Sequence, residues 1–504
     1  MDTKALRQKI LDLAIRGKLV PQDPNDEPAS VLLERIREQK KQMVKEGKLK
    51  AKDIKNDSVI FIGEDNLHYE KFADGSVKCI EDEIPFELPD GWAWTRLASI
   101  LSLSSGKSIK VRQLTDEGEY PVYGGNGING TYFDYNVETN TIIIGRVGYY
   151  CGSVYKTTSK AWVTDNALIA TVKELGIFEI DFVVEVLKYL NLGKTSVSTA
   201  QPVVSGKGIL PLIVPIPPQN EQISILESYN QIIPILNILE KEKEEVLSLV
   251  VKAKSKILAL AIRGQLVPQN PDDEPASVLL ERIRAEKEEL IKQGKIKRDK
   301  KESVIFKGED NSYYVRQGAH KETIDEQFIF ELPDNWKWCS LLNVAKIELG
   351  KTLDSAKNTG TNHPYLRSVN VRWNDVDLSD LKEMRFEPEE LERYTVRRND
   401  LLICEGGDVG RSCVWTTEDE ILYQNALHRV RFYGECNPFY FMYYMMYYES
   451  RGTIKALCKG VTIKHLTGNV LSLIPFALPP IEEQNRIVER LNHIFHLLDS
   501  ILCE

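Results

Sequence analysis

Residues 13–40 read LAIRGKLVPQDPNDEPASVLLERIREQK, and residues 260–287 repeat them as LAIRGQLVPQNPDDEPASVLLERIRAEK. A match of this length between two distant segments is far beyond chance, so the chain contains an internal duplication. Two shorter matches extend it: SVIFIGEDN (58–66) with SVIFKGEDN (303–311), and FELPDGWAW (86–94) with FELPDNWKW (330–338). We therefore predict two related halves.

The repeat continues in a weaker form along each half. GRVGYYCGSVY at 145–155 aligns loosely with GGDVGRSCVW at 406–415, and IVPIPPQNEQISIL at 213–226 matches IPFALPPIEEQNRIV at 474–488. Each half thus has a near-identical leader, a divergent middle and a proline-led helix. This organisation indicates that the leaders and helices do the same job twice, whereas the two middles do different versions of one job.

The segment after Pro217 and Pro218 carries a sustained 3-4 spacing of apolar residues. Its seam positions are Ile225, Tyr229, Ile232, Leu236, Leu239, Lys243, Val246, Val250, Ala253, Ile257 and Leu260. This spacing predicts a long helix with a coiled-coil seam. Gly264 is its expected C-terminal stop, and Pro234 is expected to kink it.

A second copy of this helix is split between the two ends of the sequence. Shifting the seam by 262 positions places it on Ile487, Leu491, Ile494, Leu498 and Ile501, and shifting it by 247 places the remainder on Leu6, Ile10 and Leu13. We predict two domains joined by an antiparallel pair of long helices, one continuous and one split, in a pseudo-twofold molecule whose ends meet. The alternative is two ordinary amphipathic helices in separate cores.

Length and composition bound the class of protein. The chain has 504 residues, of which 42% are hydrophobic and 28% charged, which suggests roughly three or four soluble structural units. No apolar run reaches the length of a membrane span, and the charged N-terminus does not resemble a signal peptide. The eight cysteines never form a CxxC pair, so we expect reduced, mostly buried thiols and a cytoplasmic location.

The net charge of −9 argues weakly against nucleic-acid binding, but it is unevenly distributed. Residues 92–213 hold 11 Lys and Arg against 10 Asp and Glu, and residues 336–474 hold 18 against 18. The acidity therefore lies mostly outside the two middles, and each middle can carry a basic face. Their short β-branched and aromatic runs between glycine-rich turns predict mixed, β-rich α+β domains.

Polar and basic residues cluster near these glycines. In the first middle they are Lys107, Lys110, Arg112, Asn126, Asn129, Arg146, Tyr149 and Tyr150, and in the second Lys351, Arg367, Asn370, Arg372, Trp373, Asn374, Arg411, Lys459, Lys464 and His465. Arg, Lys and Asn suit base-edge reading and phosphate contacts. For any one of these residues a purely structural role is the simpler interpretation; the cluster is what suggests DNA.

No catalytic set is recognisable in the sequence. GKS at 106–108 and GKT at 350–352 lack the upstream glycine of a phosphate-binding loop, because Leu101 and Ala345 occupy that place. They predict a shared turn that opens each middle. The tetrapeptide [DN]PP[FY] of amino-methyltransferases is absent. We therefore expect a non-catalytic chain without a metal site.

Taken together, these features resemble the specificity subunits of type I restriction–modification systems. The residues that carry the resemblance are PIPPQNEQ (215–222), LPPIEEQNRIV (478–488), IIIGRVGYYCGSVY (142–155), PYLRSVNV (364–371), LLICEGGDVGRSCVW (401–415) and GVTIKHLTGNVLSLIPFALPP (460–480). The resemblance covers nearly the whole chain.

The resemblance implies a mechanism in which each middle is a target recognition domain that reads one half of a bipartite DNA sequence. The helices would act as a spacer and bind two methylation subunits, which carry S-adenosylmethionine and methylate adenine N6. Two restriction subunits, with ATP and Mg²⁺, would complete a nuclease. This chain itself would bind no cofactor. By the resemblance, the first candidates for DNA contact are Lys107, Arg146, Arg367, Asn370, Arg411 and Lys464.

The predicted organisation follows from the repeat and the resemblance. It comprises a half-helix and leader arm (1–55), a linker (56–90), target recognition domain 1 (91–215), the central spacer helix (216–263), a second leader arm and linker (264–330), target recognition domain 2 (331–477) and the C-terminal spacer helix (478–504). The first domain has YPVYGGNG where the second has PYLRSVNV, so contacts are not transferable between them. The competing hypothesis is a scaffold with two ligand- or protein-binding modules and no nucleic-acid partner.

Overall fold

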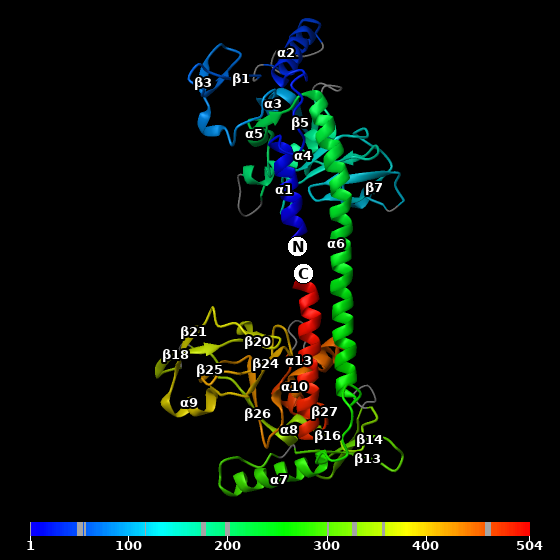
Figure 1. Cartoon of the computed structure of the whole chain (residues 1–504), viewed down its shortest axis with the longest axis vertical. Coiled ribbons are helices and arrows are strands. Elements are labelled where there is room, and N and C mark those ends of the chain that lie inside the picture. The colour runs from blue at the N-terminus through cyan, green and yellow to red at the C-terminus, as the bar shows by residue number, and fades with distance from the viewer. Residues whose placement is uncertain are drawn as a thin grey trace. The chain divides into compact units, whose positions relative to one another are not determined.

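A computed structural model of the chain divides into two compact units, residues 1–243 and 244–504. Both units combine helices with small sheets (Figure 1), which confirms the predicted mixed α and β content. The residues that the structure describes are 2–47, 54, 57–115, 117–172, 178–196, 202–299, 302–324, 330–354, 358–458 and 465–503.

The first unit begins with two helices and a small sheet, followed by a β-rich middle. Its elements are α1 (Thr3–Ile15), α2 (Ala29–Lys45), β1 (Val59–Ile62), β2 (His68–Lys71), β3 (Val77–Cys79), η2 (Glu81–Glu83), β4 (Ala93–Arg96), α3 (Leu97–Ile100), β5 (Leu101–Ser105), η3 (Val111–Gln113), β6 (Tyr120–Gly124), β7 (Gly127–Tyr132), β8 (Ile142–Gly145), β9 (Val154–Lys156), β10 (Trp162–Val163), β11 (Ala167–Val172), α4 (Ile180–Tyr189), η4 (Leu192–Thr195), α5 (Gly206–Ile209) and β12 (Ile213–Ile216).

The helix α6 (Gln219–Ile262) begins in the first unit and ends in the second. It continues through Pro234 as one helix. The second unit adds α7 (Ala276–Lys292), β13 (Val304–Lys307), β14 (Tyr313–Gln317), β15 (His320–Thr323), β16 (Lys337–Ser340), α8 (Leu341–Val344), β17 (Ala345–Leu349), β18 (Thr361–Leu366), η6 (Ser368–Asn370), β19 (Val371–Arg372), β20 (Asp375–Val376), β21 (Lys382–Phe386), α9 (Pro388–Tyr394), β22 (Thr395–Val396), β23 (Leu401–Cys404), β24 (Ser412–Val414), β25 (Ile421–Tyr423), β26 (Leu427–Phe432), α10 (Pro438–Ser450), α11 (Thr453–Leu457), α12 (Gly468–Leu473), β27 (Pro475–Leu478) and α13 (Ile481–Cys503).

The two middles share one sheet topology although their sequences differ. A four-stranded antiparallel sheet has the order β5-β11-β8-β9 in the first unit and β17-β26-β23-β24 in the second. A two-stranded sheet closes each middle, β4 with β12 and β16 with β27. Each middle also has a second sheet that contains one parallel pair, β6 with β10 and β18 with β25.

A buried helix packs against each four-stranded sheet. In the first unit, Phe182, Val183 and Leu187 of α4 are almost fully buried in the main core. In the second unit, α10 is apolar and aromatic on all sides because it is surrounded by core. The α10 helix starts where Asn437 caps the N–H of Phe439 and Pro438 occupies the first helical position.

The terminal helices contact opposite halves of α6. In the first unit, Arg7 of α1 donates to Asn237 at 2.7 Å and pairs with Glu240 at 3.2 Å. In the second unit, Lys254 of α6 pairs with Asp499 of α13 at 2.6 Å. Figure 1 shows α1 beside the first part of α6 and α13 beside its last part, within their respective units.

A buried carboxylate joins three parts of each unit. Glu221, at the start of α6, accepts hydrogen bonds from Nε1 of Trp92 at 2.9 Å and from Nε2 of Gln22 at 3.1 Å. The second unit repeats this arrangement, because Glu483 accepts from Trp336 at 2.8 Å and from Gln269 at 2.5 Å. Leader, middle domain and helix therefore meet at one acid in both units.

The glutamine after each acid fixes the same helix to the middle domain. Gln222 Oε1 accepts from the backbone N–H of Glu179 at 3.1 Å, just before α4. Gln484 Oε1 accepts from the backbone N–H of Asn437 at 2.9 Å, just before α10. The repeated Glu-Gln of the proline-led motif thus binds the leader with its first residue and the buried helix with its second.

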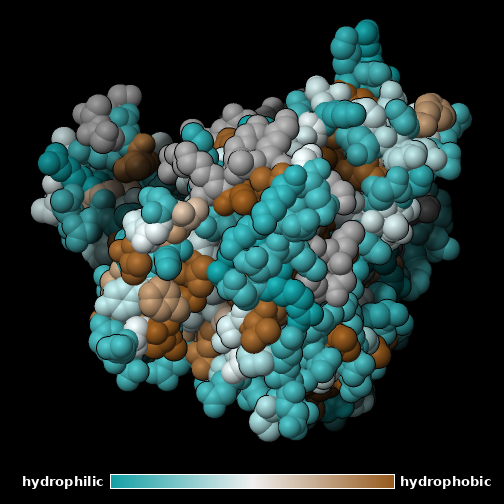
Figure 2. All heavy atoms as spheres, turned by 90° about the horizontal axis from the view of Figure 1, so that it is seen from above, coloured by the Kyte–Doolittle hydropathy of each residue, from teal (hydrophilic) through white to brown (hydrophobic). Residues whose placement is uncertain are grey.

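The surface in Figure 2 is mostly hydrophilic, and its hydrophobic residues form small separate groups. This distribution is ordinary for a folded chain in water. None of the helices described is both long enough and apolar enough to cross a membrane.

The buried acid generates a pH-dependent prediction. Burial raises the pKa of Glu221 in spite of its two hydrogen bonds. The contribution of Glu221 to stability is therefore greatest at acidic pH and is lost as the pH rises through its folded-state pKa. Replacing Trp92 with Phe removes one donor and raises this pKa further. We expect Trp92→Phe to lower the free energy of unfolding by about 1.5–3 kcal/mol at pH 8, and by less at pH 5.

The measurement is urea denaturation followed by circular dichroism at both pH values. Trp94→Phe is the matched control, because Nε1 of Trp94 has no hydrogen-bond partner among the described residues. An equal loss at pH 5 and pH 8, or an equal loss in the control, would contradict this role of the acid.

Candidate nucleic-acid interface

The structure brings Lys107 and Arg146 together where three loops of the first middle meet. The backbone N–H of Lys107 donates to the carbonyl of Val163 at 2.9 Å, and that of Arg146 donates to Asn166 at 2.9 Å. The guanidinium of Arg146 reaches Ser105 Oγ, at the end of β5, at 3.2 Å. Both cations therefore lie at the same end of the four-stranded sheet, beside the loop between β10 and β11.

The glycine-rich turn between β6 and β7 packs against this site. Gly125 lies so close to the carbonyl of Val147 that an added Cβ would be only 2.6 Å away. This approach places Asn126, which is exposed, next to the loop that follows Arg146. Tyr149 on that loop is 90% exposed, and its ring meets that of Tyr150 edge to face at 5.1 Å. Exposed aromatic rings of this kind suit stacking on bases or packing in a groove.

Three further predicted residues lie along the neighbouring hairpin. Asn129 is an exposed residue of β7. Lys110 and Arg112, which begin and form part of the short helix η3, are also exposed. Thr115, just after η3, pairs with Thr131 of β7, so this segment lies beside β7 rather than at the turn that holds Lys107.

Four of the predicted cations in the first middle are not neutralised within the described part of the chain, although other cations there, such as Lys156 and Lys160, have acidic partners. Lys107, Lys110, Arg112 and Arg146 form no ion pair with any described residue. An unpaired, solvated cation is available to a phosphate without first giving up a carboxylate partner.

In the second middle, Arg367, Asn370 and Arg411 form one cluster. Asn370 Oδ1 accepts from the backbone N–H of Arg367 at 2.9 Å, and Arg411 donates to the carbonyl of Ser368 at 3.0 Å. Both arginines have carboxylate partners, Asp380 at 2.8 Å for Arg367 and Asp408 for Arg411. The second cluster is therefore largely neutralised, unlike the first.

Two of the predicted residues are buried and serve the fold of the second middle. Asn370 is 2% exposed, and its amide also donates to the carbonyls of Asp377 at 2.9 Å and Asp380 at 3.0 Å. Lys351 is 5% exposed and pairs with Glu387, at 2.5 Å, and with Glu390. Burial alone would lower the pKa of Lys351, but these hydrogen bonds outweigh it and raise the pKa. The charge of Lys351 is thus neutralised by two carboxylates.

Arg372 and His465 are exposed residues of the second middle. Arg372 of β19 is exposed and lies 3.6 Å from Asp377. Lys459 and Lys464 lie outside the described residues. The next residue, His465, is exposed, and the backbone N–H of Leu466 donates to Glu405 at 2.9 Å, which places this segment beside the loop that carries Arg411.

The two Gly-Lys turns occupy equivalent places, as predicted. Gly106 donates its backbone N–H to Ala167 at 3.2 Å, and Gly350 donates to Leu427 at 2.9 Å. Lys351, like Lys107, donates its own N–H across the sheet, to Tyr423 at 3.3 Å. Because these N–H groups are already bonded to carbonyls, the turns do not form a cradle for phosphates.

Sequence reasoning selected polar residues and missed exposed apolar ones near the same clusters. Val111 is 83% exposed beside Arg112, Phe133 is 67% exposed after β7, and Val369 is 50% exposed between two residues of the second cluster. The signal that could have found them is an apolar residue inside an otherwise polar loop. Among the described residues, no group of three or more His, Cys, Asp or Glu side chains could hold a metal ion.

The model of the type I restriction modification DNA specificity domain matches residues 89–248 and 333–501 of this chain. The chain belongs to this family. Each match includes one middle and most of the helix that follows it, since the first ends at residue 248 inside α6 and the second at residue 501 inside α13. The recognition of this family from the sequence is therefore confirmed, with two target recognition domains in a specificity subunit of a type I restriction–modification system. Specificity subunits of this family are non-catalytic, and the family implies DNA binding in complex with partner subunits.

Individual members of the family align with most of the chain. The EcoAI specificity subunit of Escherichia coli is 27% identical over 99% of this chain and 90% of its own length, and the EcoEI specificity subunit of the same species is 25% identical over the same shares. Among solved structures, the type I S subunit from M. genitalium covers 83% of this chain and 94% of its own, at 14% identity and a TM-score of 0.35. A chain from a structure of type I system assembly covers 83% and 93%, at 17% identity and a TM-score of 0.48.

The unpaired cations of the first specificity domain generate a prediction about DNA affinity. We expect Lys107→Ala and Arg146→Ala each to weaken DNA binding by the assembled complex, and to reduce the slope of log K against log salt by about 0.9 for each phosphate that is no longer neutralised. Fluorescence anisotropy at several salt concentrations measures both effects. Lys188→Ala on α4 is the control, since this lysine pairs with Glu185 at 2.7 Å. If both variants bind DNA with the wild-type affinity at all salt concentrations, Lys107 and Arg146 are not part of the DNA interface.

The buried lysine of the second specificity domain generates the opposite prediction. Lys351→Met leaves Glu387 and Glu390 without their shared cation, so we expect a melting temperature lower by several degrees and little change in DNA affinity of the folded protein. Lys346→Met removes an exposed lysine from the preceding strand and should change neither. Unaltered melting together with weakened DNA binding would assign Lys351 to the interface instead.

Proposed function

We propose that the chain reads a bipartite DNA target, one half-site with each of the domains 91–215 and 331–477, and that it docks two methylation subunits through α1, α6 and α13. This proposal rests on a contrast between the contacts that the two units share and the surface clusters in which they differ. The two units repeat the same buried joints at Glu221 and Glu483, whereas the clusters of their middles differ in residues and in charge. Repeated structural contacts suit the binding of two identical partner subunits, and unlike surface clusters suit a DNA target with two different halves.

The contacts of the terminal helices support a split spacer. In the first unit, Gln22 after α1 meets the start of α6 and Arg7 meets Glu240, so α1 runs antiparallel to α6. In the second unit, Gln269 meets the start of α13 and Lys254 meets Asp499, so α13 also runs antiparallel to α6. We infer that α13 and α1 together form the counterpart of α6 in a pseudo-twofold molecule.

Exposed apolar residues on α6 support docking by partner proteins. Ile235 and Ile238 are 59% and 57% exposed, and Leu249 and Val251 are 63% and 61% exposed. Apolar side chains on one helix in this number favour burial against another protein. The methylation subunits are the partners whose chemistry the family requires.

The cofactors are assigned to partners and not to this chain. S-adenosylmethionine would lie on the methylation subunits, and ATP and Mg²⁺ on two restriction subunits. On this chain, the two Gly-Lys turns have backbone N–H groups that already bond to carbonyls, which does not fit a nucleotide phosphate. On this proposal the whole assembly acts on DNA in the cytoplasm.

Exchange of one domain tests the division of labour. We expect replacement of residues 92–213 by the corresponding domain of another specificity subunit to change one half-site of the methylated sequence and to leave the other half-site and the gap unaltered. The measurement is sequencing of methylated DNA from cells that express the chimaera with its methylation subunit. A change in both half-sites would contradict one domain per half-site.

Lengthening the spacer tests its role as a ruler. Four residues inserted beside Lys243 lengthen α6 by about 6 Å, and stacked base pairs rise about 3.4 Å each. We therefore expect the gap between half-sites to grow by a base pair or two, with the half-sites themselves unaltered. An unchanged gap in an active complex would refute the ruler.

A further inference from the structure

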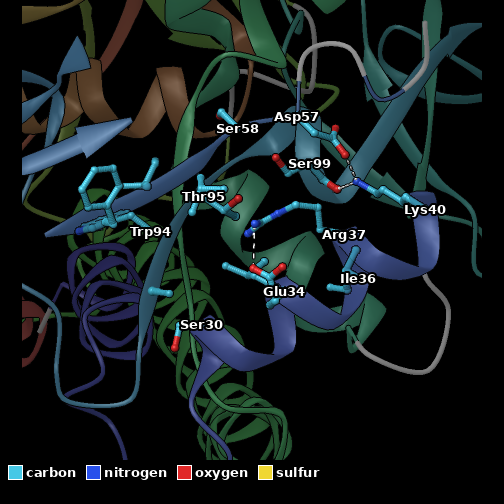
Figure 3. Close-up of a pocket in the computed structure, with 15 residues that line it drawn as sticks. Ser30, Glu34, Ile36, Arg37, Lys40, Asp57, Ser58, Trp94, Thr95 and Ser99 are labelled. Carbon is cyan, nitrogen blue, oxygen red and sulfur yellow. Dashed lines mark hydrogen bonds and ion pairs between the residues drawn. The ribbon is translucent and has the colours of Figure 1, made fainter. Parts of the chain in front are cut away.

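Contacts that recur in both units identify residues that correspond. In the first leader, the ammonium of the buried Lys40 reaches Asp57 at 2.8 Å (Figure 3). In the second leader, the ammonium of the buried Lys287 reaches Glu302 at 2.9 Å. The two lysines are also matched by the sequence repeat, so matched contacts and matched sequence agree here. In the middles, where the sequences have diverged, matched contacts alone can identify the corresponding residues.

Matched backbone hydrogen bonds place Glu405 where the first middle has Arg146. The N–H of Arg146 donates to a carbonyl of the loop between β10 and β11, and the N–H of Glu405 donates to a carbonyl of the loop between β25 and β26, both at 2.9 Å. The carbonyl of Arg146 accepts from the N–H of Val204, and that of Glu405 accepts from the N–H of Leu466, again both at 2.9 Å. Both residues are therefore held on two sides by the same contacts.

The residues just before this pair also correspond. The N–H of Gly145, the last residue of β8, donates to the carbonyl of Ser153 at 2.8 Å, and the N–H of Cys404, the last residue of β23, donates to the carbonyl of Arg411 at 2.8 Å. The strands β8 and β23 hold the same place in the order of their sheets. The sequence match of these loops starts at Gly406 in the second half and so misses the pair. A guanidinium and a carboxylate thus occupy the same place in the two domains.

Glu405 lies among the predicted DNA contacts of the second specificity domain. Arg411 is bonded to the residue before it, and Nδ1 of His465 lies 3.4 Å from the position that a Cβ on Gly406 would take. Glu405 is partly exposed, and its carboxylate forms no hydrogen bond or ion pair with the described residues, whereas Asp408 on the same loop pairs with Arg411. The carboxylate of Glu405 is therefore available to a ligand.

A carboxylate at this place limits what DNA can offer it. Phosphate oxygens are negatively charged acceptors, so they repel an ionised carboxylate, which is itself an acceptor only. A guanidinium such as that of Arg146 can bind either a phosphate or guanine. The donors that DNA exposes in its major groove are the amino groups at N4 of cytosine and N6 of adenine. A contact between Glu405 and DNA therefore has to be a contact with a base.

We propose that Glu405 reads one base of the half-site bound by the second specificity domain, by accepting a hydrogen bond from the exocyclic amino group of cytosine or adenine in the major groove. This inference rests on the proposed function, and it adds a specificity-determining residue and the chemistry of the base edge that this residue reads. Because the corresponding residue of the first domain is the donor Arg146, the two domains make opposite demands on DNA at this place.

Removal of the carboxylate tests the proposal. Glu405→Ala removes the acceptor, and Glu405→Gln keeps one acceptor oxygen without the charge. Glu435→Ala is the matched control, because Glu435 is an exposed acid that forms no ion pair with the described residues. It follows the last residue of β26, whereas the loop bonded to Glu405 precedes the first.

The experiment uses the full-length chain assembled with its methylation subunit. Sequencing of methylated DNA first identifies the two half-sites of the wild type. The affinity of each complex is then measured for duplexes in which every base pair of the half-sites is exchanged in turn. A second set of duplexes lacks one amino group at a time, with purine in place of adenine or 2-pyrimidinone in place of cytosine.

We expect the wild type to lose about fivefold to 100-fold in affinity when one particular amino group of one half-site is missing, which is the discrimination that a good base contact provides. Glu405→Ala should lose less than about twofold for the same change, and Glu405→Gln should lie between the two. Glu405→Ala should also bind non-target DNA at least as tightly as the wild type, because a charge that repels phosphates is gone. Arg146→Ala should instead weaken binding to non-target DNA, and Glu435→Ala should behave as the wild type.

Two outcomes would overturn the inference alone. If Glu405→Ala discriminates against every missing amino group as the wild type does, Glu405 reads no base. If Glu405→Ala weakens binding to all duplexes equally and lowers the melting temperature, Glu405 serves the fold. A wild-type complex without two distinct half-sites would overturn the proposed function as well, and the wild-type measurements alone identify that case.

Discussion

A carboxylate buried at the start of a helix holds each half of this protein together. Glu221 and Glu483 are almost fully buried, and each accepts an indole N–H from the middle domain and an amide N–H from the leader. An acid in such a place is costly to bury unless its oxygens are bonded. Both donors must therefore be in position, which sets the relation of leader, domain and helix within each unit.

This constraint explains why the contacts between leader, middle domain and helix are the same in both units, whereas the loops of the two middles differ. A change at Trp92, Gln22 or Glu221 would leave a buried polar group unmatched, so the three positions recur together as Trp336, Gln269 and Glu483. The loops that hold the predicted DNA contacts do not have to satisfy a buried carboxylate, so their residues can differ between the two units. They hold unpaired cations in the first domain and arginines matched by aspartates in the second. On the proposed function, these unpaired cations would make the first domain the stronger contributor to salt-dependent DNA affinity.

The sequence was sufficient to predict the features that arise from repetition and local pattern. The duplication, the long helix and the shared Gly-Lys turns follow from matched segments and from apolar spacing, both of which are visible along the chain. The family followed from motifs such as PIPPQNEQ, although their physical reason, the buried acid, needs Trp92 from a distant segment.

The limits of that prediction lie in burial and in long-range pairing. Lys351 and Asn370 have the residue types of DNA contacts, yet Lys351 meets Glu387, 36 positions away, and Asn370 closes its own loop. Residue type indicates what a side chain can do, whereas the fold decides whether it is free to do it.

The most direct test of the proposal that each domain reads one half-site is the pattern of DNA methylation that this chain directs. Single-molecule sequencing of DNA from cells that express this chain with its methylation subunit reports the modified adenines and their surroundings. We predict two different short half-sites at one fixed spacing, with one modified adenine in each and on opposite strands. A single uninterrupted motif, or two identical half-sites, would contradict the account.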